Sequence, residues 1–359
     1  MIKTKKEIIN LTKNLIKLNT NSYNFKALKI ALLEIKKILK DYKFLEFKKN
    51  NYESLLFYNF LPKNKKFKLI LNGHLDIIPA KESQFFPLIK EERLFGAGSL
   101  DMKGGLSVLV YIFKNYANKL KYPIALQVVT DEEIGGFNGT KYQIENNLLS
   151  EFVISSEPTN FDIVHKAKGI IWADIIINGV TAHSAYPWRG KNAIELTNKV
   201  INKLIKKFSN PKNDKWKTTI NLATIKTENI TYNKIPDKCI LGFDIRYIPE
   251  EKKQILKKIK SCLNNYSNLE IKIFESSFYT KKNNAYIKKI KKIIKKITNN
   301  TAVLRGANGS SDIRHYNLIG IEGIEFGPKG FGIGSDNEYV EIESLEKYYL
   351  ILEEFLKNF

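Results

Sequence analysis

Apolar residues recur with two different spacings in the first half of the chain. Short runs rich in β-branched and aromatic residues alternate with longer segments in which apolar residues recur every three or four positions. The short runs are typical of buried strands and the longer ones of amphipathic helices, so the alternation predicts a helix-flanked, mostly parallel sheet. The predicted helices are 5–18, 24–40, 104–118 and 140–148; the predicted strands are 43–48, 53–59, 67–72, 123–129 and 152–155.

The pattern changes near residue 168. The order becomes strand, helix, strand, strand, helix, strand, which is the βαββαβ order of a ferredoxin-like unit. We therefore expect an inserted domain at 168–277, with 1–167 and 278–359 forming one α/β domain around it. Within the insertion the predicted strands are 169–178, 217–226, 238–247 and 269–274, and the helices are 191–207 and 250–264. A lysine-rich helix, a strand at 301–304 and a helix from about 343 follow.

Length and composition agree with a folded protein of two domains. The 359 residues exceed the roughly 100 to 200 typical of one domain, and 43% hydrophobic residues are enough for a sizeable core. Two cysteines are too few for a disulfide framework, and polar residues interrupt the N-terminal segment too often for a signal peptide. No apolar run approaches the 18 residues of a membrane span. We expect a cytoplasmic protein.

The net charge of +22 raises the question of a nucleic-acid or membrane partner. In the segment YIKKIKKIIKKI, however, isoleucines 287, 290, 294 and 297 have helical spacing and the lysines fill the opposite face. Lysine, asparagine and isoleucine are abundant along the whole chain, which indicates a compositional bias. We expect neither a nucleic acid nor a membrane as partner; an anionic partner or substrate is the alternative.

Candidate chemistry begins with His74 and Asp76, which follow the apolar run in KLILNGHLDIIPA. A histidine in such a place is often simply packed. Ligands nevertheless bind at the carboxyl ends of strands in open α/β sheets, and the two-residue spacing places both side chains on one face. His74 and Asp76 indicate a binding site only if other polar side chains lie at the same edge of the sheet.

Acidic residues do follow the other predicted strands. Asp101 precedes the helix at 104–118, Asp131, Glu132 and Glu133 follow the strand at 123–129, and Glu157 follows the strand at 152–155. One imidazole and several carboxylates at one edge are what a divalent cation needs. Without a cation such carboxylates would repel one another. The sequence therefore predicts a metal site.

Nine motifs carry a resemblance that covers nearly the whole chain. In order they are GHLDIIPA, GAGSLDMKGG, TDEEIGGFNGT, SSEPT, TAHSAYP, NKIPD, FDIR, GSSDIR and EFGP. The chain resembles the zinc aminoacylase and metallopeptidase family that includes succinyl-diaminopimelate desuccinylase, acetylornithine deacetylase, aminoacylases and carboxypeptidase G. GSSDIR is most similar to the desuccinylase motif. Ala167 and Lys168, however, stand where desuccinylases commonly carry paired arginines.

The resemblance implies a set of metal ligands. It makes His74, Asp101 and Glu157 ligands of a first metal, and Asp101 a bridge to a second metal that Glu133 also holds. Asp76 would orient the His74 ring. The implied cofactor is zinc, or cobalt or manganese in its place.

The resemblance also implies a reaction. Glu132 matches the general base that takes a proton from a bridging water, which attacks the metal-polarised amide carbonyl, and then passes the proton to the leaving amine. His183 would stabilise the oxyanion from across a homodimer formed through the inserted domain. Asn233, Arg246, Ser311 and Arg314 would bind the substrate's carbonyl or carboxylates, the substrate being a small N-acyl amino acid or a dipeptide.

One departure from the family pattern concerns the metal. The family has a histidine ligand of the second metal four residues before a glutamate; here Glu338 is kept but Gly334 takes the histidine's place. Three alternatives follow. Asp336 or another neighbour substitutes for the missing histidine ligand, or the enzyme works with one tightly and one weakly bound metal, or its activity is lost. Deacylation of N-acyl amino acids is the function we expect; the alternatives are an aminopeptidase or dipeptidase of the same family, or a non-catalytic descendant that binds a small acidic ligand.

Overall fold

The computed structural model describes residues 2–359 and divides them into two compact units. Unit 1 extends to His165 and also contains Tyr279–Arg305 and Ser311–Phe359; unit 2 is Lys166–Phe278 with Gly306–Ser310. In this described range, no helix has both the length and the apolar character needed to cross a membrane.

Unit 1 is built on a mixed sheet with the strand order β1-β2-β6-β3-β7-β15-β8-β13, and β14 pairs with β8. Its centre is parallel: β6, β3, β7 and β15 all run in one direction, as the sequence pattern predicts. The strands are β1 (Lys43–Lys49), β2 (Tyr52–Tyr58), β3 (Lys66–His74), β6 (Ile124–Val129), β7 (Leu149–Ser155), β8 (Ile163–Ala167), β13 (Phe278–Tyr279), β14 (Leu304–Ala307) and β15 (Glu322–Glu325).

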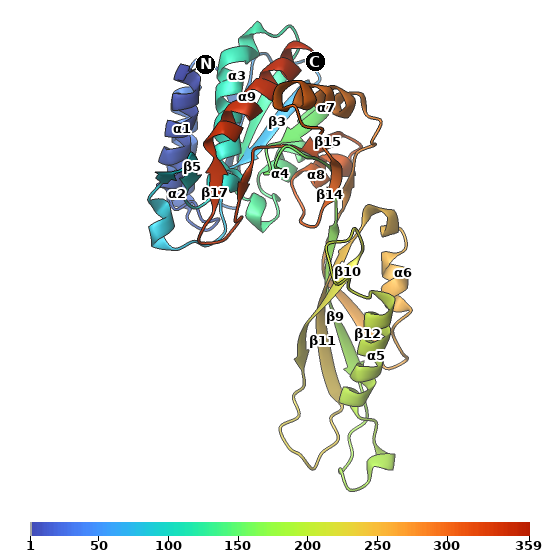
Figure 1. The fold of residues 1–359 in the computed structure, drawn as a ribbon. Coiled ribbons are helices and arrows are strands. Elements are labelled where there is room, and N and C mark those ends of the chain that lie inside the picture. The colour runs from blue at the N-terminus through green and yellow to red at the C-terminus, as the bar shows by residue number, and fades with distance from the viewer. Residues whose placement is uncertain (1) are drawn as a thin grey trace. The chain divides into compact units, whose positions relative to one another are not determined.

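Helices cover this sheet. Most present one apolar stripe, whereas the helix over Gly104–Tyr116 is buried on all sides along residues 104–113. Helices α1 (Ile2–Ile16), α3 (Gly104–Tyr116) and α9 (Ile342–Lys357) pack on one another and lie side by side in Figure 1. The lysine-rich helix α7 (Ala285–Thr298) packs on α9 and buries Ile287, Ile290 and Ile294, which confirms its predicted amphipathic character. The other helices of this unit are α2 (Phe25–Ile38), α4 (Thr140–Glu145) and α8 (Ile313–Leu318).

Several short elements of unit 1 are absent from the sequence prediction. A second sheet has the order β16-β17-β5-β4, and α8 and β15 were not predicted either. Each is too short to show a period of its own, so tertiary contacts define it. The four strands are β4 (Leu88–Lys90), β5 (Arg93–Phe95), β16 (Gly330–Phe331) and β17 (Tyr339–Glu341).

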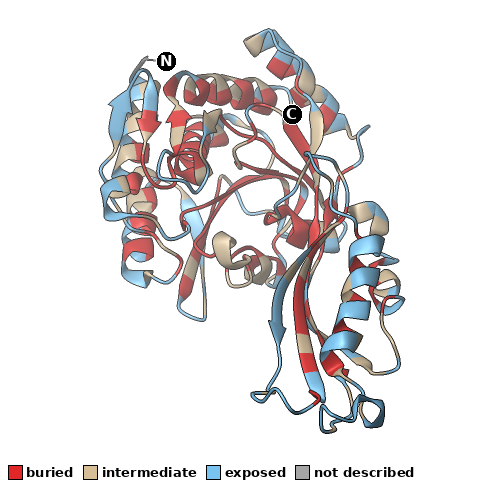
Figure 2. Cartoon of the chain, turned by 60° about the horizontal axis from the view of Figure 1, so that its bottom comes forward, coloured by how far each residue is buried: buried red, intermediate tan, exposed pale blue. Residues whose placement is uncertain are grey.

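Unit 2 has the predicted βαββαβ order. Its four antiparallel strands lie in the order β10-β11-β9-β12, as in a ferredoxin-like sheet. Helix α5 buries positions 193, 197, 200 and 204 and leaves its other face exposed, which Figure 2 shows as red and pale blue stripes. Its elements are β9 (Gly169–Asn178), α5 (Ala193–Lys207), β10 (Thr219–Lys226), β11 (Lys238–Tyr247), α6 (Ile255–Lys260) and β12 (Ser267–Glu275).

Candidate metal centre

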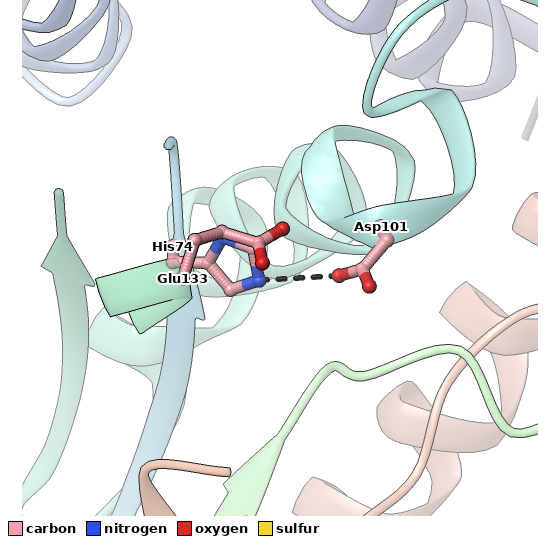
Figure 3. A group of neighbouring side chains, drawn as sticks. All are labelled: His74, Asp101 and Glu133. Carbon is pink, nitrogen blue, oxygen red and sulfur yellow. Dashed lines mark hydrogen bonds and ion pairs between the residues drawn. The ribbon is translucent and has the colours of Figure 1, made fainter. Parts of the chain in front are cut away.

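His74 is the last residue of β3 and lies at the carboxyl edge of the parallel sheet. Its ring is buried, with Nε2 3.2 Å from Oδ1 of Asp101 and 3.8 Å from Oε1 of Glu157. On the other side, Nδ1 is 2.9 Å from the backbone oxygen of Asp76. A carbonyl oxygen can only accept, so Nδ1 carries the hydrogen and Nε2 is left to face the acids. Figure 3 shows the ring with Asp101 and Glu133.

Asp101 lies in the segment that leads into α3, and Glu338 holds this segment. The buried Glu338 carboxylate accepts hydrogen bonds from the backbone N–H groups of Gly98, Leu100 and Asp101 at 2.9 to 3.2 Å. Glu338 therefore fixes the backbone that carries Asp101, and it shares no metal-capable cluster with it among the described residues.

Glu132 and Glu133 follow β6 in a single turn of 3-10 helix, Glu132–Ile134. The buried Asp76 carboxylate accepts from the backbone N–H of Glu132 at 3.1 Å and from that of Glu133 at 3.0 Å. Its Oδ1 is also 3.5 Å from Nδ1 of His74. Asp76 thus holds the acidic turn and the imidazole ring in one arrangement.

Glu157 follows β7, the next strand of the parallel sheet. Its Oε1 atom is buried and has no hydrogen-bond partner among residues 2–359. A buried carboxylate oxygen without a partner is costly, which is a sign that a cation belongs beside it.

The structure brings four of the acids and the imidazole into two overlapping groups. His74, Asp101 and Glu133 form one group and His74, Glu132 and Glu157 the other; in each, the potential ligand atoms lie within 4.8 Å of one another. Nitrogen and oxygen donors in such a set suit zinc and similar divalent ions. The residues present therefore fit a metal site.

The electrostatics of the groups point the same way. Burial, and next the charge of Asp101, raises the pKa of Glu133 to about 7 and the pKa of Glu157 well above its usual range. Burial opposes protonation of His74, but the hydrogen bonds to Asp101 and Asp76 raise its pKa well above the usual value. A divalent cation supplies the positive charge that these groups otherwise draw from protons.

Gly334 faces this centre. It lines a cavity of about 110 Å³ together with Asp101, Glu133 and Glu338. Its φ is +68°, and a Cβ built there would lie 2.6 Å from Cδ1 of Ile78. Asp336, the substitute ligand considered above, is exposed and pairs with Lys81, and neither cluster among the described residues contains it.

The remaining predicted site residues lie in both units. Ser311 and Arg314 are buried in unit 1, where the Arg314 guanidinium donates to the backbone oxygens of Ser311 and Gly135. His183, Asn233 and Arg246 belong to unit 2. His183 and Asn233 are exposed on neighbouring loops, and Arg246 on β11 forms an ion pair with Asp244.

The sequence predicts no role for His315. It identifies Glu338 only as the glutamate that the family has four residues after its histidine ligand. His315 is buried and its Nε2 lies 2.9 Å from the backbone oxygen of Gly135, in the acidic loop. In the sequence, only their positions point to these two residues. His315 directly follows the GSSDIR motif, and Glu338 lies four residues after Gly334.

A family model for peptidase family M20/M25/M40 matches residues 70–358, so the chain belongs to this family of hydrolases. It is 30% identical to the succinyl-diaminopimelate desuccinylase of Pelagibacter ubique, with 88% of this chain and 89% of that protein covered. It is 31% identical to the enzyme of the same name from Buchnera aphidicola subsp. Cinara cedri, with 79% of this chain and 83% of that protein covered.

Solved structures share the fold. Aminopeptidase PepT from Bacillus cereus has a TM-score of 0.79 at 18% identity, with 98% of both chains covered. The metallo-carboxypeptidase Sso-CP2 from Sulfolobus solfataricus has a TM-score of 0.77 at 19% identity, again with 98% of both chains covered. A dinuclear metal-binding peptidase from Bacillus subtilis has a TM-score of 0.73 at 13% identity, covering 99% of this chain and 98% of that chain. The predicted α/β zinc-peptidase-like fold and the family resemblance are confirmed.

Proposed function

We propose that this hydrolase cleaves the amide bond of N-acyl amino acids in a metal-dependent reaction of the desuccinylase type. The observation that carries the proposal is the pair of overlapping groups around His74, because one of them contains Glu132, which has the place of a general base. The similarity to two desuccinylases over most of the chain supports the choice of an acylated amino acid as substrate.

His74, Asp101, Glu133 and Glu157 are the residues that would hold metal. When bound, a zinc, cobalt or manganese ion would polarise the amide carbonyl and make water more acidic. The backbone anchors described above serve this purpose, because Asp76 and Glu338 fix the segments that carry Glu133 and Asp101.

Glu132 is the proposed base. Burial raises its pKa well above the usual value, while the neighbouring charges of His74 and Arg314 lower it. A carboxylate whose proton affinity is raised accepts a proton from water and returns it to the departing nitrogen more readily. Arg314, held by two backbone oxygens, opposes this rise, since its positive charge favours the ionised carboxylate.

Unit 2 contains a cavity that suits an acidic substituent. It measures about 430 Å³, and its charged lining residues are Lys168, Lys215, Arg246, Asp214 and Asp244, beside several amide side chains. Lys168 is 3% exposed, and burial lowers its pKa, because its ammonium lies in a desolvated place over Trp216. We assign the carboxylate of the substrate to Arg246 and Lys168. Asn233 lies beside the His183 segment, beyond the other end of β11, and is assigned to the substrate's carbonyl.

The proposal includes a homodimer formed through unit 2, in which His183 serves the partner's site. Large apolar side chains stand exposed near His183, which pairs with the strand-like segment at Lys234. Exposed hydrophobic clusters of this kind often mark contacts between proteins. They are Tyr186, Trp188, Ile230 and Tyr232.

A substrate panel tests the proposal. The purified protein is incubated with zinc, cobalt or manganese and with N-succinyl, N-acetyl and dipeptide substrates, and the release of free amine is measured. We expect release from N-acyl amino acids and its loss after chelation. If free amine is released from the dipeptides alone, the protein is a peptidase and not a deacylase. If no substrate releases free amine, an enzymatic role is contradicted.

A further inference from the structure

The acidic turn that carries Glu132 and Glu133 is anchored at both ends. At its start, the two backbone N–H groups donate to Asp76. At its end, the backbone oxygen of Gly135 accepts from the Arg314 guanidinium and from Nε2 of His315. A carbonyl oxygen has two acceptor positions, so these two donors satisfy it completely.

The second anchor comes from a part of the chain far away in sequence. Helix α8 begins next to Asp312, and a Cβ built on Gly136 would lie 2.0 Å from Oδ1 of Asp312. Gly136 has a φ of +65°, so a residue with a side chain is excluded there by space and disfavoured by conformation. The end of the turn therefore rests directly on the start of α8.

His315 is built into this contact as a neutral donor. The carbonyl can only accept, so Nε2 carries the hydrogen, and Nδ1 is buried without a hydrogen-bond partner in the described part of the chain. The ring of Phe137 meets the imidazole edge to face, with 5.7 Å between the ring centroids. Burial, followed by the charge of Arg314, lowers the pKa of His315 to about 3, which keeps the ring neutral.

We infer that His315 is a positioning residue: together with Arg314 it clamps the Gly135 carbonyl and so fixes the turn from which Glu132 acts as base and Glu133 binds metal. The inference rests on the proposed function for its catalytic consequence. The clamp matters because a displacement of about 1 Å of a catalytic group can cost on the order of 100-fold in rate.

Two substitutions of similar shape isolate the donor. His315→Gln keeps an N–H for the Gly135 carbonyl, whereas His315→Met fills the space without one. We expect His315→Met to lower kcat about 10- to 100-fold with KM changed less than about 3-fold, and His315→Gln to restore most of the loss. Tyr316→Phe is the matched control, since it removes a buried hydrogen bond to Gln127 from the same helix and does not touch the turn.

A measurement without substrate separates this inference from the proposed function. Amide hydrogen exchange of 132–136 is compared in the wild type, His315→Met, His315→Gln and Tyr316→Phe. Faster exchange of the turn in His315→Met alone supports the clamp, even if the wild type hydrolyses none of the substrates. Unchanged exchange together with an unchanged kcat in His315→Met would overturn the inference.

Discussion

The Asp76 carboxylate accepts the backbone N–H of Glu132 at 3.1 Å, so the residue proposed as base is oriented through its backbone by an acid that lies two residues beyond His74. Asp76 holds Glu133 in the same way with its other oxygen. One buried carboxylate thus links the strand that carries the imidazole to the turn that carries the two glutamates.

Asp76→Asn tests this link. The amide has one acceptor oxygen in place of two, and its NH₂ group would face a backbone N–H. We expect kcat to fall about 10- to 100-fold and metal affinity to fall as well, because the acidic turn loses one of its two backbone anchors and meets an N–H group in its place. Ser22→Ala is the control, as it removes only the hydroxyl that donates to Asp76 at 3.0 Å. Equal activity in Asp76→Asn and the wild type would contradict this role.

Glu132→Gln separates the base from the ligands. A general base typically contributes 10² to 10⁴-fold, so this variant should lose most turnover while its metal content stays nearly unchanged. Glu133→Gln, by contrast, should lower the metal content. Amine release and metal analysis of both variants check the assignment, which fails if Glu132→Gln keeps more than about half of the activity.

Gly334→His tests the departure from the family pattern. We expect the native protein to bind one metal tightly and a second weakly, since Asp101 and Glu133 leave the second site largely to water. The new imidazole should tighten the second site, because position 334 lines the cavity beside both acids. Histidine tolerates a φ of +68° better than most residues, although the Ile78 side chain must shift.

Metal titration of the purified protein measures this effect. Asp336→Ala serves as control and should leave both affinities unchanged, because Asp336 pairs with Lys81 on the surface. Two metals bound with equal, high affinity in the native chain would show that another group completes the second site.

Mixing two inactive variants tests the homodimer. If His183 acts in the partner's site, His183→Ala and Glu132→Gln should regain part of the activity on mixing, because some mixed dimers contain one complete site. Each variant alone is the control. Activity of a strictly monomeric protein, measured by light scattering on the same sample, would rule this out.

The buried His315 predicts a loss of stability in acid. Its pKa is about 3 in the folded chain, where burial and the charges of Arg314 and Lys141 disfavour protonation, and about 6.5 when unfolded. The unfolded state therefore binds the extra proton. The stability that neutral His315 contributes is fully present above pH 6.5 and is lost as the pH falls toward 3. Over this range the free energy of unfolding falls by up to about 1.4 kcal/mol per pH unit.

Urea unfolding between pH 7 and 4 measures this loss. His315→Gln keeps the donor and cannot titrate, so its free energy of unfolding should fall less steeply than that of the wild type. Tyr316→Phe should keep the wild-type slope. Parallel curves for wild type and His315→Gln would place the acid sensitivity elsewhere, for example in the carboxylates of the metal centre.

The sequence by itself determined the large elements and the chemistry of the site. Long periodic segments such as α5 and α7, and apolar runs such as β3, reveal their structure because burial of one face dictates the residue pattern. The acids at strand ends were equally visible, since parallel strands bring their carboxyl ends to one edge. Strand position alone therefore predicts that His74, Asp101, Glu133 and Glu157 lie at one edge of the sheet.

Only the tertiary structure decided how the site is held. The hydrogen bonds from Glu132 to Asp76, from Asp101 to Glu338 and from His315 to Gly135 join residues 56, 237 and 180 positions apart. Each depends on packing between elements whose contact no sequence pattern predicts. Helix α8 is also too short to be predicted from the periodicity of its apolar residues. The residue types that perform the chemistry are local information, whereas the groups that fix their positions are set by contacts that exist only after the chain has folded.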